Sequence, residues 1–97
     1  MKDSTDILSG TEIIQILGKR YAQYRKRAKM TQKEVSEQSG LSVFTISGFE
    51  NGTQTGLTMS SFIKLMRAIG EVGQMDELLP ELPQSPSERY YELNKKK

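Results

Sequence analysis

The sequence predicts an all-α fold, and three observations lead to it. Apolar residues recur at intervals of three and four through most of the chain, which is the spacing of one face of a helix. Serine and threonine residues stand three positions before glutamates, as at helix starts, and glycines follow the periodic segments. No stretch shows the alternating pattern of a strand. The 97 residues are enough for one small domain with a modest core.

The first helix is expected at about residues 11–28. Ser9 and Glu12 have the spacing of a capping box, with Thr11 as a rival cap. Basic side chains gather on the outer side of this helix and in its last two turns: Lys19, Arg20, Arg25, Lys26, Arg27 and Lys29. Such a cluster suits either a solvated helix face or a surface that faces phosphate groups.

Two short helices and a turn are expected next. Thr31 and Glu34 repeat the capping-box spacing, so a helix should run from Gln32 to a stop at Gly40. Ser42 is a good cap for a third helix, and the Asn51-Gly52 pair ends that helix.

A fourth helix should begin after Thr58 and end at Gly70, followed by a short helical turn around 74–79. Packing in the core is the favoured interpretation of its apolar side chains, with a ligand pocket as the alternative: Met59, Phe62, Leu65 and Met66. Tyr21 and Tyr24 of the first helix are likewise interpreted as packing residues.

Prolines at three positions interrupt the pattern after the fourth helix and its turn: Pro80, Pro83 and Pro86. The domain is therefore predicted to span residues 11–79, with a proline-containing tail at 80–97. Residues 1–10, which precede the first helix, are predicted to be a flexible N-terminus. A short helix at 87–94 is predicted within the tail, because Ser85 and Glu88 again have capping-box spacing. The last few residues, which include Lys95–Lys97, are expected to be disordered.

Composition excludes several function classes. The chain has no cysteine and no histidine, which removes disulfides, thiolate chemistry, imidazole bases and the usual zinc sites. No metal site, cofactor or enzymatic activity is expected, since Asp76, Glu77 and Glu81 have no nucleophile or imidazole beside them. No apolar run has membrane-spanning length, so a cytoplasmic protein without membrane contact is expected.

The most informative stretch lies between Gln32 and Gly52. Gly40 allows a sharp bend, while Leu41 and Ile46 are placed to fill the angle between two helices. Val35, Ser36 and Phe49 are expected to face inward around the same angle. This is the construction of a helix-turn-helix, which holds its second helix out from the body for the major groove of DNA.

These residues, with the Phe49-Glu50-Asn51-Gly52 exit, resemble the lambda-repressor/Cro-like, or XRE-type, helix-turn-helix family. The resemblance spans roughly residues 17–79, with the helix-turn-helix itself at 31–52. It implies a compact five-helix domain that binds double-stranded DNA. It also implies a structural ion pair between Arg25 and Glu50, and a phosphate contact from Gln32, which braces the recognition helix.

The predicted DNA-contacting positions, most of which are implied by the resemblance, lie at the start of the second helix, along the third helix and in the loop after it: Thr31, Gln32, Lys33, Ser42, Val43, Phe44, Thr45, Ser47, Gly48, Asn51, Thr53 and Gln54. Members of the family often carry arginine, glutamine or lysine at the positions of Val43, Phe44 and Gly48. The two apolar side chains here suit contact with thymine methyl groups, and the alternative is packing against a protein. Gly48 could permit close approach of the duplex.

The expected function is sequence-specific regulation of transcription, as a repressor that binds a palindromic operator as a homodimer in a bacterial or phage setting, on the nucleoid when bound to DNA. One alternative is an antitoxin of the HipB-like group, which binds a HipA-like toxin kinase and represses its own operon. The weak resemblance behind it is the Leu78–Pro83 exit. A further alternative is a helix-turn-helix used as a protein-docking module.

Overall fold

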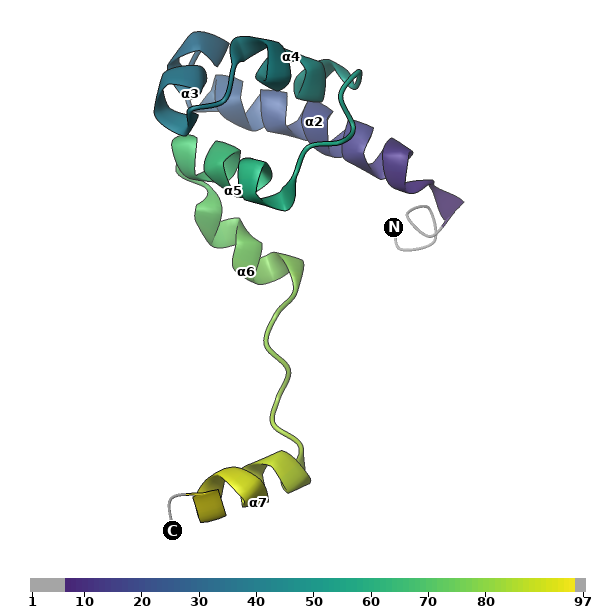
Figure 1. The fold of residues 1–97 in the computed structure, drawn as a ribbon, viewed down its shortest axis with the longest axis vertical. Helices are drawn as coiled ribbons and strands as arrows, with labels where there is room; N and C mark the ends of the chain where they lie inside the picture. The colour runs from purple at the N-terminus through teal and green to yellow at the C-terminus, as the bar shows by residue number, and fades with distance from the viewer. Residues whose placement is uncertain (1–6, 96–97) are drawn as a thin grey trace.

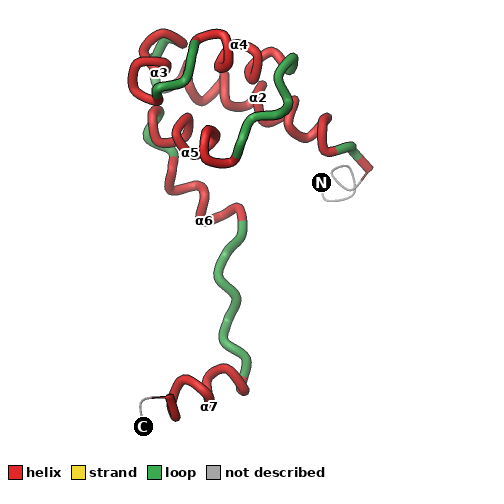
Figure 2. Tube along the Cα trace, viewed as in Figure 1, coloured by secondary structure: helices red, strands yellow, loops and turns green. Residues whose placement is uncertain are grey.

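The computed structural model describes residues 7–95 of the chain, and this part contains helices and loops without any strand, as the sequence predicts. None of its helices is both long and apolar enough to cross a membrane. In chain order (Figures 1 and 2) the elements are α2 (Gly10–Arg27), α3 (Gln32–Ser39), α4 (Val43–Asn51), α5 (Met59–Ala68), the 3-10 turn η1 (Val72–Gln74), α6 (Met75–Leu78) and α7 (Pro86–Lys95).

The predicted helix starts are confirmed by side-chain caps. The Ser9 hydroxyl accepts the Glu12 amide at 3.0 Å, and the Glu12 carboxylate accepts the Ser9 amide at 2.8 Å. Thr31 and Glu34 form the same reciprocal pair at 3.0 and 2.8 Å. These bonds satisfy amides that the first helical turn leaves unpaired. Serine or threonine hydroxyls also cap α4, α5 and α7, at Ser42, Thr58 and Ser85.

The predicted ends of the helix-turn-helix are confirmed by backbone conformation. Gly40 ends α3 with a φ of 79°, and Gly52 ends α4 with a φ of 85°. Glycine adopts this left-handed region without the steric cost that a Cβ brings. Helix α5 ends at Ala68, slightly before the predicted stop at Gly70, where φ is 77°.

The core lies where α2, α3, α4 and α5 meet, because α2 packs against α4 and α3 packs against both α4 and α5. The Phe49 ring is at the centre, with centroids 5.9 Å from Tyr21 and 6.0 Å from Phe62. The buried apolar side chains are Tyr21, Val35, Ile46, Phe49, Leu65 and Ile69. The inward positions predicted for Val35 and Phe49 are therefore confirmed.

Two of the predicted packing residues are instead exposed. Met59 is 58% exposed and Tyr24 is 43% exposed, whereas Leu65 and Tyr21 from the same helices are buried. Helical periodicity identifies the apolar side of a helix, but that side is wider than the strip that a neighbour covers. Met59 and Tyr24 lie at the margin of the strip, where each lines a hollow that stays partly open.

The chain beyond α6 leaves the helical body (Figure 1). Helix α7 lies apart from the other helices at the end of an extended segment, and the longest dimension of the molecule is 53 Å. The radius of gyration is 17.8 Å, against about 13 Å for a compact chain of this size. Helix α7, at Pro86–Lys95, lies where a short helix at 87–94 is predicted. The flexibility predicted at the chain ends concerns, in part, residues 1–6 and 96–97, which lie outside the described residues.

Candidate nucleic-acid interface

The turn between α3 and α4 is held by short local bonds. The Ser36 hydroxyl donates to the Leu41 carbonyl at 2.6 Å, and the Ser39 hydroxyl accepts the Leu41 amide at 3.1 Å. Ser36 is half-buried between the two helices. The buried Val35 and Ile46 close the angle from within. These contacts set α4 at a defined angle to α3, which is the geometry of a helix-turn-helix.

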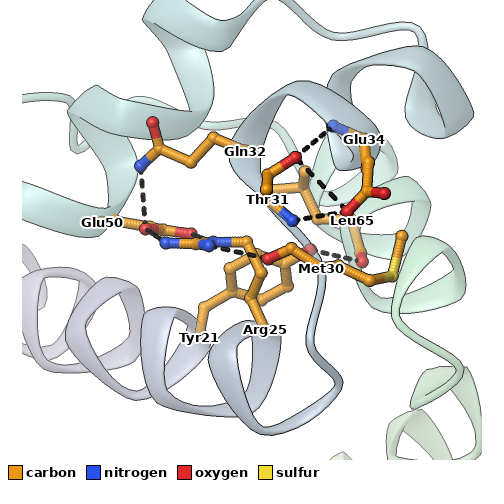
Figure 3. Close-up of polar contacts among 8 residues, drawn as sticks. All are labelled: Tyr21, Arg25, Met30, Thr31, Gln32, Glu34, Glu50 and Leu65. Carbon is orange, nitrogen blue, oxygen red and sulfur yellow. Dashed lines mark hydrogen bonds and ion pairs between the residues drawn. The ribbon is translucent and has the colours of Figure 1, made fainter.

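A group of polar contacts, which we call the Arg25 network, joins three helices (Figure 3). The Arg25 guanidinium donates from Nε and Nη2 to the two carboxylate oxygens of Glu50, at 2.7 and 2.8 Å. Its Nη1 donates to the Met30 carbonyl at 2.8 Å, in the turn between α2 and α3. The Gln32 amide nitrogen donates to Glu50 Oε1 at 3.0 Å. The network therefore braces α4 against both preceding helices, and the expected Arg25–Glu50 pair is present.

The Arg25 network is shielded from water. The side chains of Arg25 and Glu50 are only 10% and 6% exposed. The hydrogen bonds to Glu50 raise the pKa of Arg25, and they outweigh the opposing effect of burial. Among the described residues, no buried side-chain nitrogen or oxygen is left without a hydrogen-bond partner. Burial of this ion pair is accordingly matched by complete hydrogen bonding.

Tyr21 lies beneath the Arg25 network and links α2 to α5. Its hydroxyl donates to the Leu65 carbonyl at 2.7 Å. Burial, and next the negative charge of Glu50, raise the pKa of Tyr21 well above its ordinary value of 10.0. The phenol consequently stays protonated and keeps donating this bond at neutral pH.

The outer face of α4 carries apolar side chains that the protein leaves uncovered. Phe44 is 76% exposed and Val43 is 41% exposed, in the first turn of the helix. Ser42 is exposed beside them, and its hydroxyl bonds to Thr45 at 3.0 Å. Thr45 and Ser47 are half-buried. The structure thus presents most of the predicted α4 positions on its surface, with the two apolar residues foremost.

Gly48 is placed differently from the expectation that it faces the duplex. It is buried, and a Cβ built on it would overlap the Gln54 side chain. The Gln54 and Thr53 amides also donate to the Gly48 carbonyl, at 3.0 and 2.9 Å. The close approach that requires glycine is therefore made by the loop after α4. We correct the sequence interpretation to a packing role for Gly48, and note that Gln54 is half-buried by the same contact.

The loop after α4 is a compact polar turn. The Asn51 side-chain oxygen accepts from the Thr53 amide at 3.0 Å and from the Thr53 hydroxyl at 2.8 Å. Both side chains are exposed. Gln15, which sequence reasoning did not single out, donates to the Gly52 carbonyl at 3.1 Å and ties this loop to α2. No local sequence pattern predicts a contact between residues that are 37 positions apart.

The start of α3 forms the other side of this surface. Thr31 and Lys33 are exposed and Gln32 is half-buried. The amides of a helix start carry a partial positive charge, which favours an anion in front of them. Thr31, Gln32 and Lys33 are therefore placed at an end of the helix that suits a phosphate.

The basic residues of α2 do not all lie on one side of the helix. Arg25 is buried in the network, while Gly18 and Gln15 mark the side of α2 that faces α4. Arg20 instead lines a hollow with Tyr24 and with α5 residues. Lys64 and Arg67 of α5 lie beside Gln38 and Ser39, at the opposite end of α3 from Gln32. Helix spacing of 100° per residue could have predicted this division of the cluster.

Comparison of the sequence with known protein families agrees with this geometry. A helix-turn-helix family model matches residues 22–73, which is more than half of the chain and contains α3, α4 and α5. No curated protein and no solved structure gives a significant match. The matched segment contains every residue of the Arg25 network and most of the core. The chain belongs to the XRE-type helix-turn-helix family of DNA-binding regulators.

Proposed function

We propose that this protein is a sequence-specific repressor that binds a palindromic operator in double-stranded DNA as a homodimer. One observation carries the proposal: α4 exposes Val43 and Phe44 on its outer face, while the Arg25 network holds its inner face to α2 and α3. A rigidly held helix with uncovered side chains is what major-groove reading requires.

In the proposed complex α4 lies in the major groove. Phe44 and Val43 contact thymine methyl groups, which are the apolar features of base edges in this groove. The hydroxyls of Ser42, which caps α4, and of Ser47, within α4, bond to base edges or phosphates. Discrimination would then come from apolar contact and shape more than from charged hydrogen bonds.

Phosphate groups are contacted from the start of α3 and from the loop after α4. The Gln32 amide nitrogen carries two hydrogens, and one is donated to Glu50, so the second can be donated to a phosphate oxygen. Thr31, Lys33, Asn51 and Thr53 are exposed and supplement this contact. A single lysine in this set gives each domain modest charge, which makes a dimer necessary for useful affinity.

Selection of bound fragments from a random duplex library, with the purified chain at moderate salt, tests the proposal. We expect enrichment of two inverted half-sites whose centres lie about one helical turn, roughly 10 base pairs, apart. Phe44→Asp should abolish the enrichment, because it places a negative charge in the groove. Gln38→Asp adds the same charge at the far end of α3 and should leave enrichment intact.

Other outcomes would contradict the proposal in distinct ways. A folded protein that enriches no sequence would point to a protein-docking module. Enrichment of a single half-site would contradict the palindromic operator. Equal enrichment by the Phe44→Asp variant would show that Phe44 on α4 does not take part in reading the DNA sequence.

A further inference from the structure

An apolar groove runs between α2, α5 and α6 on a side of the body away from the DNA-contacting face of α4. It consists of two adjoining hollows of about 210 and 170 Å³, which share Leu17 and Phe62. We call this surface the apolar groove and define it by six side chains: Leu17, Tyr24, Met59, Phe62, Met66 and Leu78.

The apolar groove is incompletely covered in the single chain. Leu17 is 37% exposed, Tyr24 43%, Met59 58% and Leu78 61%. Contiguous apolar surface of this kind is unfavourable in water and marks an interaction site when it is not scattered singly. The groove is concave, so it fits an inserted segment better than it fits a flat surface.

The segment of residues 79–95, which we call the C-terminal arm, also exposes apolar side chains. Leu79, Leu82 and Leu93 are 87%, 88% and 72% exposed, and α7 lies apart from the body (Figure 1). A helix of ten residues is marginal in water unless an apolar side is packed against a partner. The reciprocal cap between Ser85 and Glu88 favours the helix locally, but such caps add too little to hold it alone.

We propose that the C-terminal arm of a second copy of this chain docks into the apolar groove, reciprocally, so that two chains exchange their arms. The exchange covers the exposed leucines of each arm and the half-covered groove of the other copy in one step. It also gives α7 an apolar surface to pack against, which stabilises a helix of this length.

Charge complements the apolar fit. Arg20 lines the groove itself, and Arg27 lines a hollow beside Tyr24. The first part of the arm, residues 79–88, carries Glu81 and Glu88 and no basic residue, while Arg89, Glu92 and Lys95 follow in the rest of the arm. The acidic first part of the arm is attracted to these arginines, and the attraction should orient the arm as it docks.

The backbone of the arm argues against docking into the groove of the same chain. Leu79, Leu82 and Ser85 each precede a proline, which restricts them to extended conformations. The arm begins directly after Leu78, which lines its own groove. Return of α7 to that groove would need a reversal within residues 79–86, where the prolines hold the chain extended. Crossing to a neighbouring copy needs no reversal.

This inference deepens the proposed function, because it names the contact that forms the homodimer. Its test contains no DNA, so the two can fail separately. A dimer formed by exchanged arms without operator binding would leave the inference standing. Operator binding by a dimer whose arms are dispensable would contradict the inference alone.

Sedimentation equilibrium of the full chain without DNA is the first test. We expect a dimer whose dissociation constant rises at least about tenfold in Leu82→Gln and in Leu93→Gln, since each removes one buried leucine. Phe44→Gln is the matched control, because Phe44 is as exposed as Leu93 but lies on α4. A monomeric wild-type chain, or a dimer that neither arm variant weakens, would overturn the proposal.

Cysteine pairing then tests which chain supplies the arm. The natural chain has no cysteine, so introduced residues report without background. Mixed single variants Leu17→Cys and Leu93→Cys should form a disulfide-linked dimer on mild oxidation, whereas Phe44→Cys with Leu93→Cys should not. The chain that carries both Leu17→Cys and Leu93→Cys should also give linked dimers. A monomer with an internal disulfide would show that the arm folds back, and would overturn the exchange.

Discussion

Arg25 and Glu50 form a two-point ion pair across the contact between α2 and α4, with nitrogen–oxygen distances of 2.7 and 2.8 Å. The planar guanidinium fork matches the carboxylate, and neither side chain is more than one-tenth exposed. A pair this buried is costly to break from one side, because the remaining charge then has no counter-charge in a region that is shielded from water.

We therefore expect Arg25→Ala to lower the free energy of unfolding by about 3–5 kcal/mol. Arg25→Lys should recover only part of the loss, since an ammonium cannot donate to both carboxylate oxygens and to Met30 in the same geometry. Urea denaturation followed by circular dichroism gives the values. The double variant Arg25→Met/Glu50→Leu should be more stable than Arg25→Ala. If Arg25→Ala cost less than 1 kcal/mol, the pair would not brace α4.

The contact between Gly18 and Phe49 gives a second prediction. A Cβ on Gly18 would overlap the backbone carbonyl of Phe49, which cannot rotate away as a side-chain end can. We expect Gly18→Ala to destabilise the domain by about 1–3 kcal/mol, although alanine is the better helix former. Gly10→Ala lies in the same helix with nothing within 4 Å of the new methyl, and it should be neutral or stabilising in the same thermal melt. Equal melting temperatures would contradict the close approach of α2 and α4.

Tyr21 should make stability depend on pH in the alkaline range. Its pKa is raised in the folded protein, so below pH 10 the phenol is protonated in both states and the full stability is present. Above pH 10 the unfolded chain loses this proton first, and the free energy of unfolding falls as the pH rises. Absorbance near 295 nm should show one tyrosine that ionises only when the protein unfolds. That late transition should be missing in Tyr21→Phe, which should also lose about 1 kcal/mol at neutral pH.

Gln32→Ala separates bracing from DNA contact. Loss of the bond to Glu50 should lower the free energy of unfolding by about 1 kcal/mol. The proposed loss of the phosphate contact should weaken the binding free energy for any duplex by about the same amount. Fluorescence anisotropy on specific and random duplexes measures both affinities. Gln38→Ala, at the other end of α3, is the control and should change neither. Unchanged affinity in Gln32→Ala would remove Gln32 from the interface.

Phe44 can be tested by changing the DNA as well as the protein. Replacing thymine by uracil in the selected operator removes the 5-methyl group and little else. Wild-type protein should lose about tenfold in affinity at the contacted thymine, and Phe44→Ala should lose as much on the unmodified operator but nothing more on the uracil duplex. Additive losses would mean that Phe44 and the methyl group do not touch.

Local interactions made much of this structure predictable. The capping pairs of Ser9 with Glu12 and of Thr31 with Glu34 lie three residues apart, so the sequence states both partners together. Gly40 and Gly52 mark helix ends for equally local reasons. The contact of Gln54 with Gly48 depends instead on how the loop folds back, and the bond from Tyr21 to Leu65 joins residues 44 positions apart. The helical periodicity of apolar residues does not predict which residues form such long-range contacts. The resemblance to a family supplied Arg25 and Glu50, which residue spacing alone did not.

Separation of the bracing residues from the proposed DNA-reading residues has an evolutionary consequence. Arg25, Gln32 and Glu50 support α4 from its inner side, whereas Val43 and Phe44 are exposed and contribute little to folding. Surface substitutions of that kind change stability by small amounts. A lineage, or a designer, can therefore exchange the two outer side chains for others without first compensating a loss of stability. New target sequences are reachable by single steps through folded intermediates.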